Sequence, residues 1–200
     1  MTLRLRSARP GEVSRLTEIA HAAKRHWGYP ETLLRLWRAD LTVRPDFVTR
    51  HPTCAAVESG TIVGFYALSR DGERFELEHC WVDPTFMRRG VGTALFAHAL
   101  DTVRALGGVR LTIASDPNAE GFYRRMGARR VGEVPSRLRG RMLPLLSIEL
   151  ERPTQHTPHR GASRGGGAGR GVWPRGSTQL IGTDVSARRT AAARRLGRAA

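Results

Sequence analysis

Residues 86–95, FMRRGVGTAL, decide the fold, because two arginines and two glycines there join a strand pattern to a helical one. The first amides of a helix have no intrahelical partner, and the helix dipole adds positive charge at the same end. Gly90 and Gly92 let a phosphate approach the backbone, and Arg88 and Arg89 supply charge-assisted donors. The stretch therefore predicts an anion site that suits a pyrophosphate.

Four interpretations compete for this turn. A Walker-type nucleotide site requires Gly-Lys-Ser/Thr, which does not follow here. A Rossmann dinucleotide site requires a third glycine at position 95, where this chain has Leu95. Coenzyme A and a plain glycine turn on a surface helix remain, and the rest of the sequence has to decide between them.

The patterns on either side of the turn predict a single α/β domain, with a mixed sheet of six or seven strands and about four helices. Strand patterns fall at 3–9, 55–59, 62–69, 75–82, 109–115, 129–134 and 142–150. Helical patterns fall at 13–23, 33–41, 91–106 and 119–126. We expect the strand at 3–9 to lie at an edge of the sheet. Asp116 and Pro117 are typical of a helix N-cap followed by proline at the first helical position.

The chain has 200 residues and a formal net charge of +15, from 33 Lys+Arg and 18 Asp+Glu. Residues 153–200 hold nine arginines and one acid, and they are rich in glycine and poor in apolar residues. Such a segment cannot offset the entropy cost of ordering, so we expect a disordered tail after a domain at 1–152. The tail has two interpretations, nonspecific binding to RNA, DNA or another polyanion, and a passive extension. The second is favoured, because Trp173 is its only aromatic platform.

The cysteine, histidine and apolar patterns limit which cell compartment and which cofactors are expected. Cys54 and Cys80 do not form a disulfide-rich or metal-ligand spacing, which predicts a reduced, cytoplasmic protein. The seven histidines form neither an H-E-x-x-H motif nor a Cys/His array, so no metal is expected. The N-terminus has no apolar leader, and no apolar run approaches ~18 residues, so secretion and membrane spanning are not expected.

Two motifs resemble those of the GNAT (Gcn5-related N-acetyltransferase) superfamily. Residues 87–92, MRRGVG, are similar to the family signature Gln/Arg-x-x-Gly-x-Gly/Ala, except that Met87 removes the usual polar side chain. Residues 116–128, DPNAEGFYRRMGA, are similar to Asn-x-x-Ala-x-x-Phe-Tyr-x-x-x-Gly-Phe, with Asp116 in the asparagine place and Ala128 in the final aromatic place. The resemblance covers roughly residues 3–150 and implies a single acyl-CoA N-acyltransferase domain of the GNAT type.

The resemblance implies transfer of an acetyl group from acetyl-CoA to an amine by direct attack. It also implies that both motifs and the strand before them bind acetyl-CoA. The implied contacts are Trp81, Val82, Met87, Arg88, Arg89, Gly90, Val91, Gly92, Thr93, Asp116, Asn118 and Tyr123. Trp81 and Val82 are expected to pair with the pantetheine arm as an added strand would.

The amine needs a base, because an aliphatic amine of pKa ~10.4 is neutral in only about one molecule in two thousand at pH 7. Glu76 lies fourteen residues before Gly90, an offset that resembles the glutamate base of histone-acetylating family members, and Glu78 ranks second. Strand alternation places both glutamates on one face, with Leu77 and His79 on the other. Two ordinary solvated strand acids are the alternative, and His79 suits a structural role better than that of a base.

Two further groups are expected at the thioester. The backbone N–H of Cys80 matches the family's donor to the carbonyl oxygen, while its thiol is expected to be buried and inert. Tyr123 matches the family's general acid, and an ordinary tyrosine of pKa ~10 can protonate a thiolate of pKa ~8.5 at a cost of about 2 kcal/mol. A core tyrosine without a chemical role is the alternative.

The acceptor groove is expected to be walled in part by residues 24–37, KRHWGYPETLLRLW, as it is by the matching segment in family members. His26, Trp27 and Tyr29 are the candidate substrate-binding residues, and an aromatic turn packed between two helices is the alternative. A small-molecule amine is the favoured acceptor, a peptide N-terminus is the second option, and a homodimer is compatible with either. The rival functions are a non-catalytic acyl-CoA-binding module and nucleic-acid binding through the tail.

Overall fold

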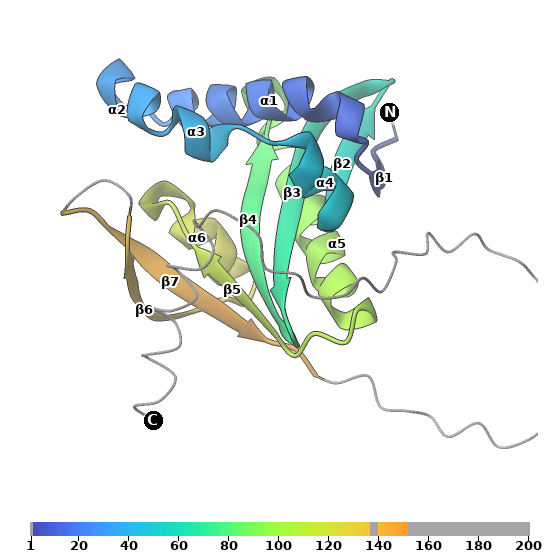
Figure 1. Cartoon of the computed structure of the whole chain (residues 1–200), viewed down its shortest axis with the longest axis vertical. Helices are drawn as coiled ribbons and strands as arrows, with labels where there is room; N and C mark the ends of the chain where they lie inside the picture. Colours follow the sequence, from blue (N-terminus) through green and yellow to red (C-terminus); the bar gives the residue numbers. More distant parts are fainter. Residues whose placement is uncertain (1, 137–139, 152–200) are drawn as a thin grey trace, which may run out of the picture. The chain divides into compact units, whose positions relative to one another are not determined.

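The computed structural model describes residues 2–136 and 140–151, and the fold below refers to these. The predicted tail at 153–200 lies outside the described residues. Seven strands form one mixed sheet in the order β1-β2-β3-β4-β5-β7-β6, in which only β4 and β5 run parallel (Figure 1). The strands are β1 Arg4–Ser7, β2 Thr53–Glu58, β3 Thr61–Asp71, β4 Arg74–Val82, β5 Arg110–Ala114, β6 Arg129–Pro135 and β7 Met142–Glu149. The strand count and the edge position of β1 confirm the predictions.

The described residues form more helices than the four expected. They are α1 Val13–His26, α2 Glu31–Leu36, α3 Arg38–Leu41, α4 Pro45–Arg50, α5 Val91–Ala105 and α6 Pro117–Arg125, with 3₁₀ turns η1 Pro10–Glu12 and η2 Pro84–Phe86. The pattern at 33–41 splits into α2 and α3, because Trp37 leaves the helical conformation at φ −88° and ψ 1°. The six-residue α4 was missed, since it buries only Val48 and is too short for a helical period to appear.

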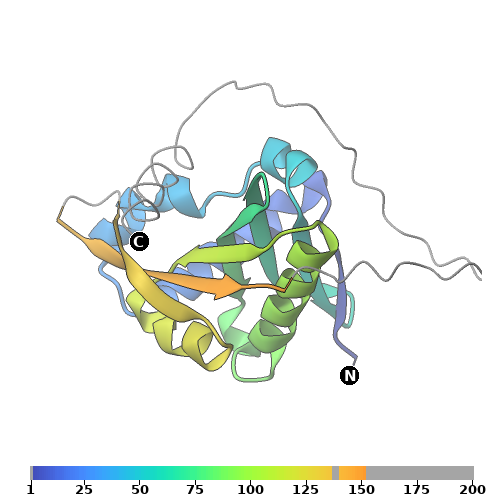
Figure 2. The same ribbon diagram turned by 90° about the horizontal axis from the view of Figure 1, so that it is seen from below.

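Helices cover both faces of the sheet (Figure 2), and the two largest clusters of buried hydrophobic residues lie on opposite faces. One core contains the apolar stripe of α5 together with Tyr123 of α6, and we call this side the α5/α6 face. The other contains the buried residues of α1 to α4, and we call it the α1–α4 face. Strand β3 contributes to both cores, because Phe65 points to the α1–α4 face while Tyr66 and Leu68 point to the α5/α6 face. It too carries a register irregularity, at Val63 opposite Ala56 and Val57 of β2.

Strand β4 does not alternate simply, because it carries a β-bulge. Leu77 pairs with Leu68 and His79 pairs with Ala67, so Glu78 is an extra residue in β4. The bulge reverses the alternation, and the ring of His79 lies 5.8 Å from that of Phe65 on the α1–α4 face. The prediction that His79 shares a face with Leu77 is therefore wrong. Period-two alternation cannot anticipate an inserted residue.

Strands β4 and β5 part soon after they meet. Among the described residues they pair only at Arg74–Arg110, Phe75–Leu111 and Glu76–Thr112, although β4 continues to Val82. The two strands diverge visibly beyond this point (Figure 1). One side of β4 from residue 77 onward therefore has no strand neighbour, and the backbone there is open to a ligand.

Candidate active site

The glycine-rich turn begins α5 through two residues in the left-handed region. Arg88 has φ 62° and Gly90, the N-cap of α5, has φ 82°. A Cβ on Gly90 would meet no atom within 4 Å, so this glycine is required by its backbone angle and not by lack of space. At Gly92 a Cβ would make ordinary contacts, 3.6 Å from Val82 Cγ2 and 3.7 Å from Phe122 Cζ. The protein itself therefore leaves room for a small side chain at Gly92.

The turn ends in a free helix N-terminus. The amide of Ala94 donates to the carbonyl of Gly90 at 3.0 Å, so the amides of residues 91–93 precede the first intrahelical bond of the fifteen-residue α5. The two predicted arginines differ. Both are exposed, but Arg89 also forms an ion pair with Glu58 at 3.0 Å and lies over the ring of Phe86. Much of the charge of Arg89 is thus already balanced by the protein.

The open side of β4 presents particular amides. The amide of Asp83 donates to the carbonyl of Val63 in β3 at 2.8 Å. Since successive amides of a strand alternate in direction, those of Cys80 and Val82 point away from β3, toward the side that β5 has left. This is the direction expected for a Cys80 donor and a Val82 ligand contact. Trp81 differs from its prediction, because its backbone faces β3 and is occupied by the β3–β4 ladder.

Tyr123 and Cys80 meet on the α5/α6 face of this gap. Tyr123 is buried, and its ring packs against Phe96 and Phe122 at centroid distances of 5.2 and 5.1 Å. Its hydroxyl lies near the Cys80 thiol, and the two groups influence each other's pKa. Burial raises the pKa of the thiol to about 12 and raises the pKa of the Tyr123 hydroxyl well above its usual value. Both groups therefore keep their protons at neutral pH.

The predicted acids and His79 lie on the other face. Glu76 lies between Phe75 and Leu77, which belong to the opposite core, so alternation turns Glu76 toward the α1–α4 face. The bulge residue Glu78 accepts a 2.6 Å hydrogen bond from Ser69 on the same side.

Histidine 79 has the wrong proton arrangement for a base. The indole N–H of Trp81 donates to Nδ1 of His79 at 3.1 Å. An indole can only donate, so Nδ1 is the acceptor and neutral His79 carries its proton on Nε2. The lone pair that would receive a proton is already engaged. This arrangement agrees with the expected structural role.

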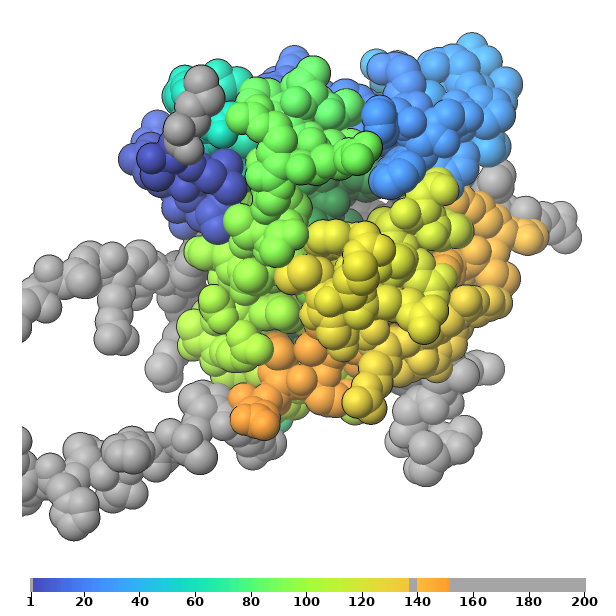
Figure 3. Space-filling model, turned by 180° about the vertical axis from the view of Figure 1, so that it is seen from behind, coloured from blue at the N-terminus to red at the C-terminus, as the bar shows by residue number. Residues whose placement is uncertain are grey.

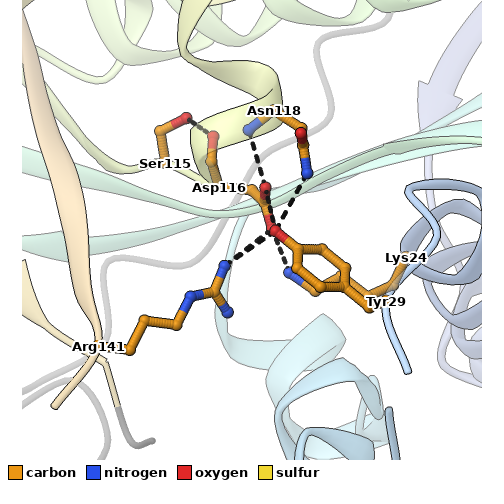
Figure 4. A network of polar contacts seen from close by, with 6 residues as sticks. All are labelled: Lys24, Tyr29, Ser115, Asp116, Asn118 and Arg141. Atoms are coloured by element: carbon orange, nitrogen blue, oxygen red, sulfur yellow. Dashed lines mark hydrogen bonds and ion pairs between the residues drawn. The ribbon is translucent and has the colours of Figure 1, made fainter. Parts of the chain in front are cut away.

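A hollow opens between α1–α3, α6 and the β4–α5 segment on the face seen in Figure 3. Five side chains form a polar network that connects α1 and the turn after it with the start of α6 and the residue before β7 (Figure 4). Asp116 forms an ion pair with Lys24, accepts from the Tyr29 hydroxyl at 2.9 Å, caps α6 by accepting from the Asn118 amide at 2.9 Å, and lies 3.5 Å from Arg141. Arg141 and the Asn118 side chain also donate to the Tyr29 hydroxyl, at 3.0 and 3.1 Å. The network connects segments that are far apart in the sequence.

Aromatic rings support the two cations of the network. Lys24 Nζ lies 4.7 Å from the Tyr29 ring and 4.5 Å from the Trp37 ring, and Arg141 Cζ lies 5.2 and 4.6 Å from the same rings. Burial lowers the pKa of Lys24, and Asp116 opposes this only in part. Burial alone would raise the pKa of Asp116, but Lys24, the Asn118 amide and Tyr29 together hold it below its usual range. The ion pair is therefore charged at neutral pH.

The structure brings some predicted residues together and separates others. Asp116, Asn118 and Tyr29 belong to one network, although two of them were assigned to acetyl-CoA and one to the acceptor. His26 and Trp27 are exposed at the end of α1 and do not enter this network. Sequence reasoning placed Lys24 and Trp37 at the two ends of the expected groove segment without singling them out, and it missed Arg141. One signal was available, because Lys24 is the only lysine in an arginine-dominated chain.

Comparison with known proteins settles the family. A sequence model described as the Acetyltransferase (GNAT) family matches residues 14–128, more than half of the chain. The chain belongs to the GNAT acetyltransferase family. It is 37% identical over 82 residues to N-alpha-acetyltransferase RimI of Mycobacterium tuberculosis, which covers 38% of this chain and 51% of that protein. The chain thus matches about half the length of this curated relative.

Solved GNAT structures share the fold at lower identity. The PaiA N-acetyltransferase of Thermoplasma acidophilum, crystallised with coenzyme A, gives a TM-score of 0.66 at 15% identity, over 75% of this chain and all of that one. A GCN5-related N-acetyltransferase of Rhodopseudomonas palustris gives 0.65 at 22% identity, over 75% of this chain and 97% of that one. Within the described residues of this GNAT protein, no helix is long and apolar enough to cross a membrane.

Proposed function

We propose that this protein transfers the acetyl group of acetyl-CoA to a primary amine by direct attack. The observation that carries the proposal is the gap between β4 and β5. Two carboxylates, Glu76 and Glu78, border it on the α1–α4 face, and the Tyr123 hydroxyl borders it on the α5/α6 face. The amides of Cys80 and Val82 point into it. An amine and a leaving thiolate would therefore meet opposite groups on opposite sides.

The binding half of the proposal rests on backbone groups. The free amides at 91–93, with the positive end of the α5 dipole, would hold the pyrophosphate. The Val82 backbone would pair with the pantetheine arm, which runs like a strand in the place that β5 has left. Arg88 would add a charge-assisted contact from the exposed part of the turn. No metal enters this scheme.

The chemical half requires one bond to form and one to break. The amine nitrogen forms a bond to the acetyl carbon as the carbon–sulfur bond breaks, and the Cys80 amide donates to the carbonyl oxygen while negative charge develops there. The proton lost by the amine passes to Glu76 or Glu78, directly or through water, and the departing thiolate accepts a hydrogen bond from Tyr123. Burial makes full proton transfer from Tyr123 costlier than the ~2 kcal/mol expected for an ordinary tyrosine.

A free-thiol assay with acetyl-CoA and a panel of small amines tests the proposal. Protein thiols give little background, because burial raises the pKa of Cys54 to about 11 and that of Cys80 to about 12. Turnover with at least one amine is expected. Binding of acetyl-CoA without turnover on any amine or peptide would leave a non-catalytic acyl-CoA-binding module instead.

Glu76→Gln and Glu78→Gln, compared across pH, assign the base. The variant that removes it should lose most rate near neutral pH and recover as pH approaches the pKa of the amine, because the free amine is then supplied by solvent. A variant that loses only acceptor affinity at constant kcat marks a binding carboxylate instead. Two wild-type pH profiles would remove both glutamates from the proton path.

A peptide α-amino group is the second candidate acceptor. The observation that favours it is the 37% identity to RimI, whose name describes an N-alpha-acetyltransferase. Short peptides belong in the same assay, and a kcat/KM for a peptide at least about tenfold above that for every small amine would make this candidate the function.

A further inference from the structure

The network at Asp116 contains more positive than negative charge. Among the described residues, Lys24 and Arg141 both reach the Asp116 carboxylate, so one negative charge there serves two cations. The other members, Tyr29 and Asn118, are neutral. The positive end of the α6 dipole points to the same place, because Asp116 is the N-cap of that helix.

This excess charge is held in place and remains accessible. The Lys24 and Asp116 side chains are nearly buried, and both cations lie against the rings of Tyr29 and Trp37. The charge of Arg141 also contributes to lowering the pKa of Lys24, as expected for two like charges in a confined space. The Arg141 side chain remains 18% exposed, so an anion can reach it from solvent. An anion bound there would balance the second cation.

The position of this charge relates it to the acceptor. Asp116 lies two residues after the end of β5, beyond the point where β5 leaves β4, and Lys24 comes from α1 on the face to which Glu76 turns. Negative charge thus lies along β4, and positive charge lies where the end of α1 and the starts of α6 and β7 meet. A simple cationic amine would use only the first of these regions.

We infer that the acceptor is a small zwitterion of the amino-acid type, whose amine faces the β4 carboxylates and whose acidic group binds Arg141. This inference rests on the proposed acetyl transfer and deepens it by naming the acceptor class. Arg141 suits the role because its planar guanidinium can donate two parallel bonds to a carboxylate. Lys24 holds the Asp116 carboxylate and so positions the network.

A substrate series tests the inference in the full-length protein. Glycine, β-alanine, 4-aminobutyrate and 5-aminovalerate place the carboxylate at increasing distance from the amine, and their methyl esters lack the negative charge. We expect one acid to exceed its ester at least about tenfold in kcat/KM, mainly through KM. The optimal length then measures the spacing between the two regions.

Two variants are expected to act in opposite directions. Arg141→Gln should raise KM for the preferred acid at least about tenfold and leave the ester unchanged. Esters have a lower amine pKa than the free acids. Dividing the KM of the variant by the wild-type KM for the same substrate cancels this difference. Asp116→Asn keeps a capping side chain and releases Arg141 from its carboxylate, so KM for the acid should fall severalfold. Arg124→Gln, an exposed arginine of α6, is the matched control and should change neither value.

The outcomes separate this inference from the function on which it rests. Equal use of acids and esters, or a preference for a peptide without a nearby acidic group, would overturn the zwitterion while acetyl transfer stands. A rise in KM in both Arg141→Gln and Asp116→Asn would mean that the network is only structural, which also overturns it. Absence of turnover with every amine would remove the proposed function and this inference together.

Discussion

The two sides of the β4–β5 gap are built from different groups. The side assigned to acetyl-CoA consists of backbone, namely the free amides of α5, the left-handed Gly90 and the outward amides of Cys80 and Val82. The side proposed for the acceptor consists of charged side chains, and its network draws on Lys24 and Arg141, far apart in the chain. A site made of backbone should tolerate exchange of side chains, such as Met87 in place of the usual polar residue. A site made of side chains changes its ligand with each substitution.

The largest effect is expected when the backbone site at the start of α5 is blocked. Gly92→Glu should lower CoA affinity at least about 1000-fold, roughly 4 kcal/mol, because a carboxylate would occupy the phosphate position. The fold should survive, since an acidic residue in the first turn of a helix is favourable. Calorimetry with CoA measures the effect. Gly92→Ala is the matched control, because a Cβ there makes only ordinary contacts, and unchanged affinity in folded Gly92→Glu would contradict the pyrophosphate assignment.

The second-largest effect is expected when the side-chain network at Asp116 is broken. It should appear as a lower free energy of unfolding. Lys24→Met should lower the free energy of unfolding by about 3 kcal/mol, because it removes one partner of a buried ion pair. Chemical denaturation measures it, and Arg25→Met, the exposed neighbour in α1, should cost little. A loss below about 1 kcal/mol would show that Arg141 and Tyr29 compensate the Asp116 charge without Lys24.

The same variant should change the acid limb of stability. The pKa of Asp116 is depressed in the folded protein, so its contribution is present above the unfolded pKa of about 3.9 and is lost as pH falls through the folded value. Without Lys24, burial pushes that pKa upward, and the loss should begin at higher pH. Identical pH profiles for the two proteins would contradict the coupling.

The third effect concerns chemistry on the α5/α6 face. Tyr123→Phe should lower kcat roughly 100-fold, about 2.7 kcal/mol, and change CoA affinity less than about threefold, because the ring packing is kept. Tyr66→Phe is the matched control. Its buried hydroxyl bonds His98 and Thr102 at 2.8 Å, so its loss should lower stability and leave kcat unchanged. Similar kcat losses in both variants would assign the Tyr123 effect to packing.

The smallest expected effect is a gain in CoA affinity on the backbone side of the gap. Met87→Gln restores the residue type that is usual at this position of the family signature. One added hydrogen bond should raise CoA affinity about three- to tenfold, or ~1 kcal/mol. Titration calorimetry detects such a gain, with Met87→Leu as the apolar control. A gain as large for leucine would show that the side chain acts through packing.

The same contrast explains what the sequence could predict. The α5 stripe, the Asp116 cap and the strand count follow from local periodicity and capping rules, and the structure confirms them. The Glu78 bulge and the assignment of His79 to a face do not, because one inserted residue has no local signature. The motifs also marked Asp116 and Tyr29 separately. Their meeting with Arg141 depends on tertiary packing, which spacing along the chain does not reveal.

Within the described chain, β4 and β5 share three residue pairs at one end, and this seam has a mechanical consequence. Strands β1 to β4 on one side and β5, β7 and β6 on the other are joined across the sheet by this short ladder, so we expect the sheet to flex there more easily than elsewhere. A strand-like ligand arm inserted beyond the seam would extend it and stiffen the whole sheet. Without a ligand, the protein should therefore be most compliant along the line where we propose that acetyl-CoA and the acceptor meet.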